Sequence, residues 1–370
     1  LGAGVIGAGW LARLTANGVE CRVVDPDPEA PRRIAEVLEN AGRAWGRLTT
    51  APLPAPGARE PAGAAAEAVA GAELVIEAVP ERIDLKRRVY AEIERANREA
   101  LIASSTSGYR PSDLQAEMET PERLVVAHPF NPVYLLPLVE LVAGARTDPE
   151  AIPRAAEAFE ALGMHPLHVR REIDAFLADR LMEALWREAL WLVRDEVATA
   201  AEVDDAIRYG CGLRWAQMGT FQTFHIAGGE RGMRHFMAQF APALAAPWTR
   251  LTDVPEMDEA LVDKIAAQTE AQAAGRDVRA LERIRDDNLV AILQALKGQG
   301  WGAGAVLAAH EKRLHDRAGG AAAPGLSRPV ETGRRVVPGA WCDYNGHMNE
   351  SRYGQLFSDA ADGLITLIGA

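Results

Sequence analysis

The sequence predicts an α/β domain with a parallel sheet, followed by an all-α domain and the start of a third domain. Three observations support this prediction. Over residues 1–144, short apolar runs alternate with amphipathic segments, which is the pattern of parallel strands joined by crossover helices. From about residue 174 the apolar residues recur at helical spacing instead. Residues 318–333 are rich in Ala, Gly and Pro, which is typical of a linker.

The strands expected in the first domain are buried apolar runs, as in sheets that helices cover on both faces. They are Cys21–Asp25, Glu73–Val79, Leu101–Ala103, Arg123–Ala127 and, after a helix over roughly 148–162, His165–Val169. A further strand should precede the opening glycines, but only Leu1 stands before Gly2. We therefore expect this sequence to lack most of the first strand and most of the last domain.

The second domain is expected to be helical throughout. Apolar residues from Phe176 to Val193 fall close to i, i+3 and i+4, so one long helix should run to about Val197. Further helices are expected over 201–210, 227–241, 256–272 and 276–297. The predicted organisation is a first domain over 1–172, a second over 173–317, a linker over 318–333 and the start of a third domain over 334–370.

Composition excludes several classes of function. The net charge of −12, the pI near 5.3 and the lack of a long Lys/Arg block argue against nucleic-acid binding. Three cysteines lie far apart without CxxC spacing, so neither a disulfide framework nor a metal site is indicated. The sequence has no run of 18 apolar residues and no signal peptide. We expect a soluble cytoplasmic protein that binds no membrane.

The chain opens with a glycine turn of the kind that binds dinucleotides in Rossmann-type domains. In Gly2-Ala3-Gly4-Val5-Ile6-Gly7, the glycines allow a tight turn, close approach of a pyrophosphate and contact between helix and strand. Asp25 ends the next expected strand, where a carboxylate can bind a ribose 2′-hydroxyl and repel a 2′-phosphate. NAD is therefore expected in preference to NADP. Asp25 could instead be a turn residue before Pro26.

A hydroxyl group, a histidine and a carboxylate follow in that order. Ser107 closes the run Ser104–Ser107, His128 ends an apolar strand, and Glu140 lies within another apolar run. Oxidation of a secondary alcohol needs a base near neutral pH, and histidine is suited to that task. A buried carboxylate needs a partner, and pairing Glu140 with the imidazole would stabilise the imidazolium. A histidine buried for structural reasons alone is the other interpretation.

This order of groups resembles the 3-hydroxyacyl-CoA dehydrogenase family over about residues 1–315. The resemblance implies that His128 and Glu140 are the family's catalytic pair, and that Ser107 contacts the substrate hydroxyl. The family commonly forms homodimers through the helical domain, so a homodimer is expected here. The resemblance also implies further cofactor contacts, from Glu81, Lys86, Ser107 and Asn131.

One position departs from the family pattern. The helix that opens the second domain carries an asparagine near the active site in the family, whereas this sequence has Asp179. The carboxylate could supply negative charge to the site, or it could pair with Arg180 or Arg187.

Long segments of the second domain resemble a branch of the family that acts on a small 3-hydroxy acid carrying a quaternary ammonium group. Such a cation donates no hydrogen bonds, so aromatic faces or a carboxylate must replace its water. For each aromatic side chain the alternative is simple core packing. The candidates for substrate contact are Asp179, Tyr134, Trp186 and Trp215, with Phe221 and Phe224 as further aromatic surface.

The last segment resembles the start of a hotdog (α+β) thioesterase domain. The resemblance rests on Trp341–Tyr353 and places Asp343 at the acidic position that acts on a thioester, with Asn349 and Tyr353 next. Some 35 residues cannot form this domain, so no thioesterase activity is expected from the segment alone.

Two other functions remain open at this stage. One is a 3-hydroxyacyl-CoA or L-gulonate-type 3-hydroxy acid dehydrogenase, which in the CoA case would need a basic groove for the phosphates. The other is a non-catalytic, crystallin-like storage or binding protein on the same fold, against which the intact Ser107, His128 and Glu140 argue.

Overall fold

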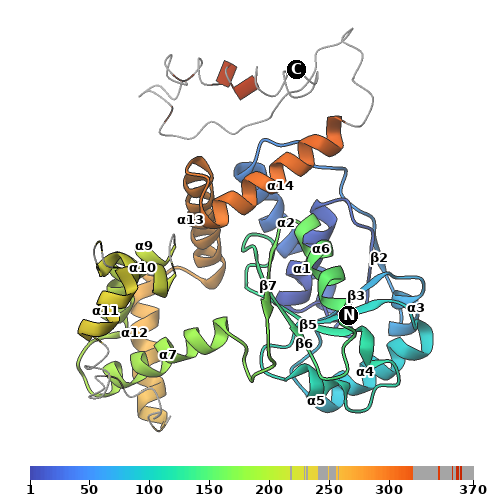
Figure 1. The fold of residues 1–370 in the computed structure, drawn as a ribbon, viewed down its shortest axis with the longest axis horizontal. Coiled ribbons are helices and arrows are strands. Elements are labelled where there is room, and N and C mark those ends of the chain that lie inside the picture. Colours follow the sequence, from blue (N-terminus) through green and yellow to red (C-terminus); the bar gives the residue numbers. More distant parts are fainter. Residues whose placement is uncertain are drawn as a thin grey trace.

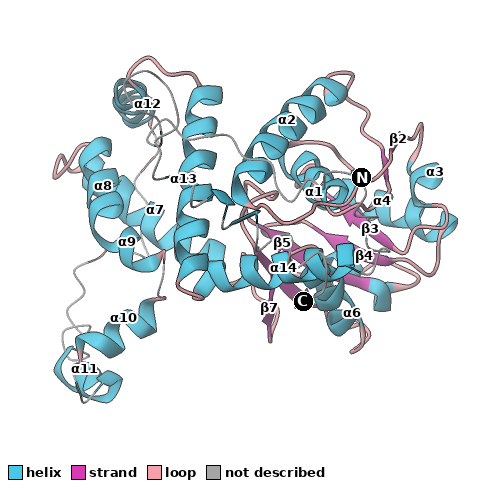
Figure 2. Ribbon diagram, turned by 90° about the horizontal axis from the view of Figure 1, so that it is seen from above, coloured by secondary structure: helices cyan, strands magenta, loops and turns pink. Residues whose placement is uncertain are grey.

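The computed structural model of the chain has an α/β half and a helical half that extends away from it (Figures 1 and 2). The sheet lies in the α/β half, and the last two helices return to it from the helical half. The structure describes residues 1–216, 219–228, 230, 232–240, 249, 256 and 258–319, with single residues and pairs between 341 and 360.

The main sheet has five strands in the order β3-β4-β5-β6-β7. The predicted strands are confirmed to within two residues at each end. The strands are β3 (Leu74–Glu77), β4 (Leu101–Ser104), β5 (Leu124–Pro129), β6 (Leu138–Ala143) and β7 (His165–Val169), and a separate parallel pair is formed by β1 (Cys21–Val23) and β2 (Arg59–Pro61).

Helices cover both faces of the main sheet. On one face Trp10 and Phe159 pack in a cluster of buried apolar side chains, and on the other Tyr90, Ile93 and Leu114 do so. This explains why the strands are apolar on both sides. The helices are α1 (Val5–Ala16), α2 (Ala30–Leu48), α3 (Ala65–Val69), α4 (Ile83–Ala96), α5 (Pro111–Gln115) and α6 (Ala151–Ala161).

The predicted fold class is confirmed, but one strand pair of the sheet is antiparallel. β6 is antiparallel to β5, although it pairs with β7 in parallel. The segment 130–137 that joins β5 to β6 is shorter than the dozen or more residues that a parallel crossover needs. The reversal makes His128 of β5 and Glu140 of β6 direct cross-strand partners.

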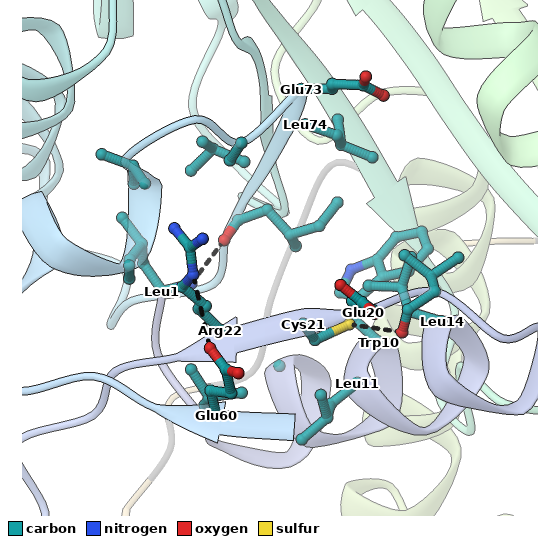
Figure 3. Close-up of a pocket in the computed structure, with 18 of the residues that line it drawn as sticks. Leu1, Trp10, Leu11, Leu14, Glu20, Cys21, Arg22, Glu60, Glu73 and Leu74 are labelled. Carbon is teal, nitrogen blue, oxygen red and sulfur yellow. Dashed lines mark hydrogen bonds and ion pairs between the residues drawn. The ribbon is translucent and has the colours of Figure 1, made fainter. Parts of the chain in front are cut away.

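A cavity of about 560 Å³ lies between β1 and β3 (Figure 3). At one end of the cavity the N–H of Gly2 donates a hydrogen bond to the carbonyl oxygen of Val24. None of the candidate catalytic side chains lines it. This cavity is therefore not the candidate active site.

The long helix predicted from Phe176 is shorter than expected. Ala175 and Phe176 have positive φ, which excludes them from the helix, and Glu196 has positive φ beyond its C-terminus. A π-helical turn over Ile207–Cys211 lies between the second and third helices of this half. The helices are α7 (Ala178–Arg194), α8 (Ala200–Ala206), α9 (Gly212–Trp215), α10 (Thr220–Ala227), α11 (Gly232–Phe240) and α12 (Glu259–Ala273).

The last two helices form a hairpin that packs on the α/β half (Figure 1). They are α13 (Val278–Gly298), which was predicted, and α14 (Gly302–Gly319), which was not. The start of α14 is rich in glycine and alanine, so its sequence has no clear helical periodicity of large apolar residues. Val290, Leu293 and Leu307 of the hairpin join Trp45 of α2 in one buried cluster. Among the described residues, no helix is long and apolar enough to cross a membrane.

Candidate active site

The candidate base, His128, lies near the end of β5 and is buried. Its Nδ1 is 2.9 Å from Oε2 of Glu140, its cross-strand partner. A carboxylate only accepts hydrogen bonds, so in the neutral imidazole Nδ1 carries the proton and Nε2 keeps its lone pair. His128 therefore presents Nε2 as its proton-accepting atom.

The second oxygen of Glu140 is bound from the helical half. The backbone N–H groups of Leu177 and Ala178 donate to Oε1 at 2.9 and 3.0 Å. They belong to the first turn of α7, where helical N–H groups lack partners within the helix. Burial alone would raise the pKa of Glu140, but the hydrogen bonds from His128, Ala178 and Leu177 outweigh it and lower the pKa. Glu140 is thus a carboxylate at neutral pH.

The turn that precedes α7 places these amide groups. Ala175 and Phe176 have φ values of 57° and 51°, in a region that residues other than glycine seldom adopt. The buried Phe176 ring lies 5.5 Å from the imidazole, measured between ring centroids, and the Phe130 ring lies 5.2 Å from it. The packing that holds this strained turn therefore also fixes the orientation of the imidazole.

Asp179 lies on the open side of the imidazole. Its Oδ2 is 3.5 Å from Nε2 of His128, and its side chain is 20% exposed. Burial raises the pKa of Asp179, the nearby His128 lowers it and Glu140 raises it, with a net rise. Arg187 pairs with Glu183, so the alternative in which Asp179 pairs with Arg187 is wrong. Asp179 instead faces the atom that would remove a proton.

The glycine turn has the geometry that a pyrophosphate needs. An added Cβ at Gly2 would lie 2.5 Å from the Ala78 carbonyl oxygen, and one at Gly7 would lie 1.9 Å from that of Gly2. At Gly4 nothing lies within 4 Å of such a Cβ. Gly4 stands just before α1, which begins at Val5, so open space meets the free N–H groups of a helix.

Asp25 connects the end of the first strand pair to this turn. Its Oδ2 accepts a hydrogen bond from the N–H of Ala3 at 2.6 Å, and its Oδ1 accepts one from Asp27 at 2.8 Å. The second contact is the turn role considered for the sequence. Each carboxylate oxygen has a further acceptor site, so both contacts leave room for a ribose hydroxyl.

A buried ionic cluster lies beside the glycine turn. Nζ of Lys86 is 2.8 Å from Oε1 of Glu77 and 3.2 Å from Oε2 of Glu81. Tyr90 and Ser104 each donate to Oε2 of Glu77 at 2.6 Å. Sequence reasoning found Lys86 and Glu81 but missed Glu77. The signal was present, because a carboxylate inside an apolar strand needs a partner.

Ser107 and Asn131 follow the carboxyl ends of β4 and β5, which are parallel neighbours. Both residues are exposed. Glu81 lies next to the same loop, because its Oε1 accepts hydrogen bonds from Thr106 and from the N–H of Gly108. The polar groups predicted for the site thus gather at one edge of the sheet, where α/β proteins bind their ligands.

The aromatic candidates are placed less favourably. Tyr134 is buried, and its hydroxyl donates to Asp286 of α13, which makes it part of the helical hairpin's contact and corrects its proposed contact with substrate. Trp186 is 55% exposed on α7, seven residues and so about 10 Å beyond Asp179 along the helix. Trp215 of α9 is 39% exposed. Asp343 lies outside the described residues.

Comparisons with known proteins give the family of the chain. The model of the 3-hydroxyacyl-CoA dehydrogenase NAD-binding domain matches residues 1–173, and that of the C-terminal domain of the same family matches residues 176–266. A solved structure of 5-formyl-3-hydroxy-2-methylpyridine 4-carboxylic acid 5-dehydrogenase, titled an NAD+-dependent dismutase, is similar with a TM-score of 0.68 and 28% identity. That match covers 80% of this chain and 97% of the other.

Two curated relatives are more similar in sequence. The L-carnitine dehydrogenase/betainyl-CoA thioesterase of Rhizobium meliloti is 56% identical over 378 residues, covering 100% of this chain and 76% of the relative. The L-carnitine dehydrogenase of Mesorhizobium japonicum is 57% identical over 320 residues, covering 85% of this chain and 88% of the relative.

Proposed function

The chain belongs to the 3-hydroxyacyl-CoA dehydrogenase family, and we propose that it oxidises the 3-hydroxyl group of L-carnitine to 3-dehydrocarnitine with NAD. The observation that carries the proposal is the buried His128–Glu140 pair, with Nε2 open toward Asp179. The 56% identity with the Rhizobium meliloti relative supports the choice of carnitine. A non-catalytic protein would have no need of a base oriented in this way.

NAD binding fits the residues present. The open space at Gly4 and the N-terminus of α1 would take the pyrophosphate, and Asp25 would take the adenosine ribose. Glu81, Lys86 and Asn131 would hold the nicotinamide half, beside the edge of the sheet where His128 lies. The bound cofactor supplies the hydride acceptor for the reaction.

In the proposed mechanism, Nε2 of His128 removes the proton of the substrate hydroxyl. Glu140 stabilises the imidazolium that forms, because its carboxylate accepts the Nδ1 proton at 2.9 Å. The amides of Leu177 and Ala178 keep that carboxylate ionised. Ser107 would hold the hydroxyl oxygen from the loop after β4.

Three further parts of the proposal concern the rest of the molecule. The exposed apolar side chains of α7 and α10, among them Leu181 and Phe221, support a homodimer formed through the helical half. The residues after 334 would begin a thioesterase domain with Asp343 in its acidic position, as in the double name of the Rhizobium meliloti relative. We place the protein in the cytoplasm, where NAD is available.

A direct test measures NADH formation with L-carnitine, D-carnitine and 3-hydroxybutyryl-CoA in parallel. We expect turnover with L-carnitine and NAD, and little with the other two substrates or with NADP. The Asp25→Ala variant should reduce the preference for NAD about 10-fold, because the carboxylate no longer repels a 2′-phosphate. Turnover of the CoA ester at a rate equal to that of L-carnitine would overturn the proposed substrate.

A further inference from the structure

The imidazole of His128 lies between two carboxylates from different elements. Glu140 of β6 binds Nδ1 at 2.9 Å, and Asp179 of α7 faces Nε2 at 3.5 Å. The rings of Phe130 and Phe176 pack against the imidazole. Within the described residues, these two carboxylates are the charged groups in contact with the ring. A carboxylate oxygen thus faces each of the two ring nitrogens.

Asp179 also occupies the position that a reacting hydroxyl must take. A base within hydrogen-bond reach of the hydroxyl requires that oxygen within about 3 Å of Nε2. Oδ2 of Asp179 lies beside Nε2. Substrate binding therefore has to displace this oxygen or place the substrate hydroxyl next to it. The first-turn position of Asp179 in α7 would by itself give a helix-stabilising role. That role does not explain why the carboxylate faces the base.

The proposed substrate carries a positive charge close to its reacting hydroxyl. In carnitine, only three covalent bonds separate the hydroxyl oxygen from the quaternary nitrogen. If the hydroxyl binds Nε2, the trimethylammonium group must therefore lie near Asp179. A quaternary cation needs a carboxylate or aromatic faces in place of water, and Asp179 supplies the carboxylate at the required place.

We propose that Asp179 is a specificity-determining residue that binds the quaternary ammonium group and, in doing so, leaves His128 free to act as a base. This inference rests on the proposed function. The trimethylammonium group of the substrate draws the Asp179 carboxylate to itself, so Nε2 of His128 no longer faces a carboxylate and can accept the hydroxyl proton. A substrate of the same shape that lacks the cation leaves Asp179 facing Nε2. The charge of the substrate thus controls the availability of the base.

The test compares L-carnitine with its carbon isostere 3-hydroxy-5,5-dimethylhexanoate, which lacks the cation, in the wild type and in the Asp179→Asn variant. We expect the variant to lose about 10- to 100-fold in kcat/KM for carnitine, mainly through KM, and to keep or improve its activity on the isostere. The acid limb of its pH profile should move to lower pH, because one anion next to the imidazolium is gone. Asp179→Glu should retain the preference for the cation.

Glu183→Gln is the matched control, since Glu183 lies one turn further along α7 and pairs with Arg187. It should change neither the substrate preference nor the pH profile. An equal loss on both substrates with an unmoved acid limb would show a structural role for Asp179 and overturn the inference.

A wild type that oxidises neither substrate would contradict the proposed function, not this inference. In that case, NMR titration of the His128 ring in the free protein decides the matter. If Asp179→Asn does not move the midpoint of protonation to lower pH, the inference is wrong.

Discussion

The α/β half and the helical half differ in how far their apolar side chains are buried. In the α/β half, apolar side chains fill two clusters on the two faces of the sheet. In the helical half, many large apolar side chains are exposed on the helices. They include Leu181, Met182, Leu185, Trp186, Tyr209, Leu213, Phe221 and Ile226.

We relate this difference to the two proposed tasks of the protein, which are cofactor binding and substrate binding. The α/β half buries apolar side chains on both faces of its own sheet, so the glycine turn and the His128–Glu140 strand pair rest on a packed core. An exposed apolar surface of this extent indicates an interaction site. The substrate side of the molecule is therefore expected to depend on a partner surface, whereas the cofactor side does not. The predictions below test that division.

The largest expected effect is on the chemical step in the α/β half. His128→Gln should lower kcat about 10³-fold, because a general base contributes about 10²- to 10⁴-fold. NADH binding, measured by fluorescence titration, should be unchanged, since the glycine turn belongs to a different loop. A parallel loss of NADH affinity would mean that cofactor and base sites are not independent.

The second prediction concerns the contact that joins the hairpin to the α/β half. His310 of α14 is buried against Trp45 and Gly163, and neither ring nitrogen has a hydrogen-bond partner among the described residues. Burial, with the positive charge of Arg13 next in importance, lowers the pKa of His310 to about 4. The folded protein therefore holds a neutral ring that the unfolded chain protonates near its ordinary value.

His310 therefore does not lower the free energy of unfolding above about pH 6.5. It lowers that free energy progressively as the pH falls to about 4. The loss amounts to about 3 kcal/mol over that window. Urea unfolding at pH 7 and pH 4.5 measures it. His310→Leu should remove most of this dependence, whereas His168→Gln, at an exposed histidine of β7, should not. An unaltered pH dependence in His310→Leu would mean that other groups cause the loss.

The third prediction tests the junction between the halves. Glu140 receives His128 from the α/β half and two backbone N–H groups from α7. Glu140→Gln should lower kcat about 30-fold, less than loss of the base, because a neutral amide does not stabilise the imidazolium. The acid limb of the pH–rate profile should move to lower pH, since the wild-type carboxylate is ionised throughout that range. A profile that does not move would contradict the role of the pair.

The sequence predicted the parts of the site that are marked by short local patterns. The glycine turn, Asp25, His128 and Glu140 each stand at the end or in the middle of a recognisable apolar run. The pairing of His128 with Glu140 was inferred from the cost of a buried carboxylate, and the antiparallel register explains it. The contacts that the sequence did not predict join residues distant in the chain: the α7 amides bind Glu140, and Tyr134 binds Asp286. Periodicity does not encode such contacts.

The smallest effect on the chain itself is expected from its exposed apolar surface. Leu181 of α7 is 67% exposed, so Leu181→Asp removes little buried area and should change the free energy of unfolding by less than about 0.5 kcal/mol at low protein concentration. If a second copy of the chain covers α7, the same change places a charge in that interface and should weaken self-association about 10-fold or more. Sedimentation equilibrium over a range of concentrations measures this change in self-association.

Leu190→Ala is the contrasting control, because Leu190 is buried on the same helix and its truncation should cost about 2–5 kcal/mol of stability. A wild type that stays monomeric at all concentrations, or a Leu181→Asp variant with undiminished association, would show that this surface serves another purpose and that the helical half needs no second copy.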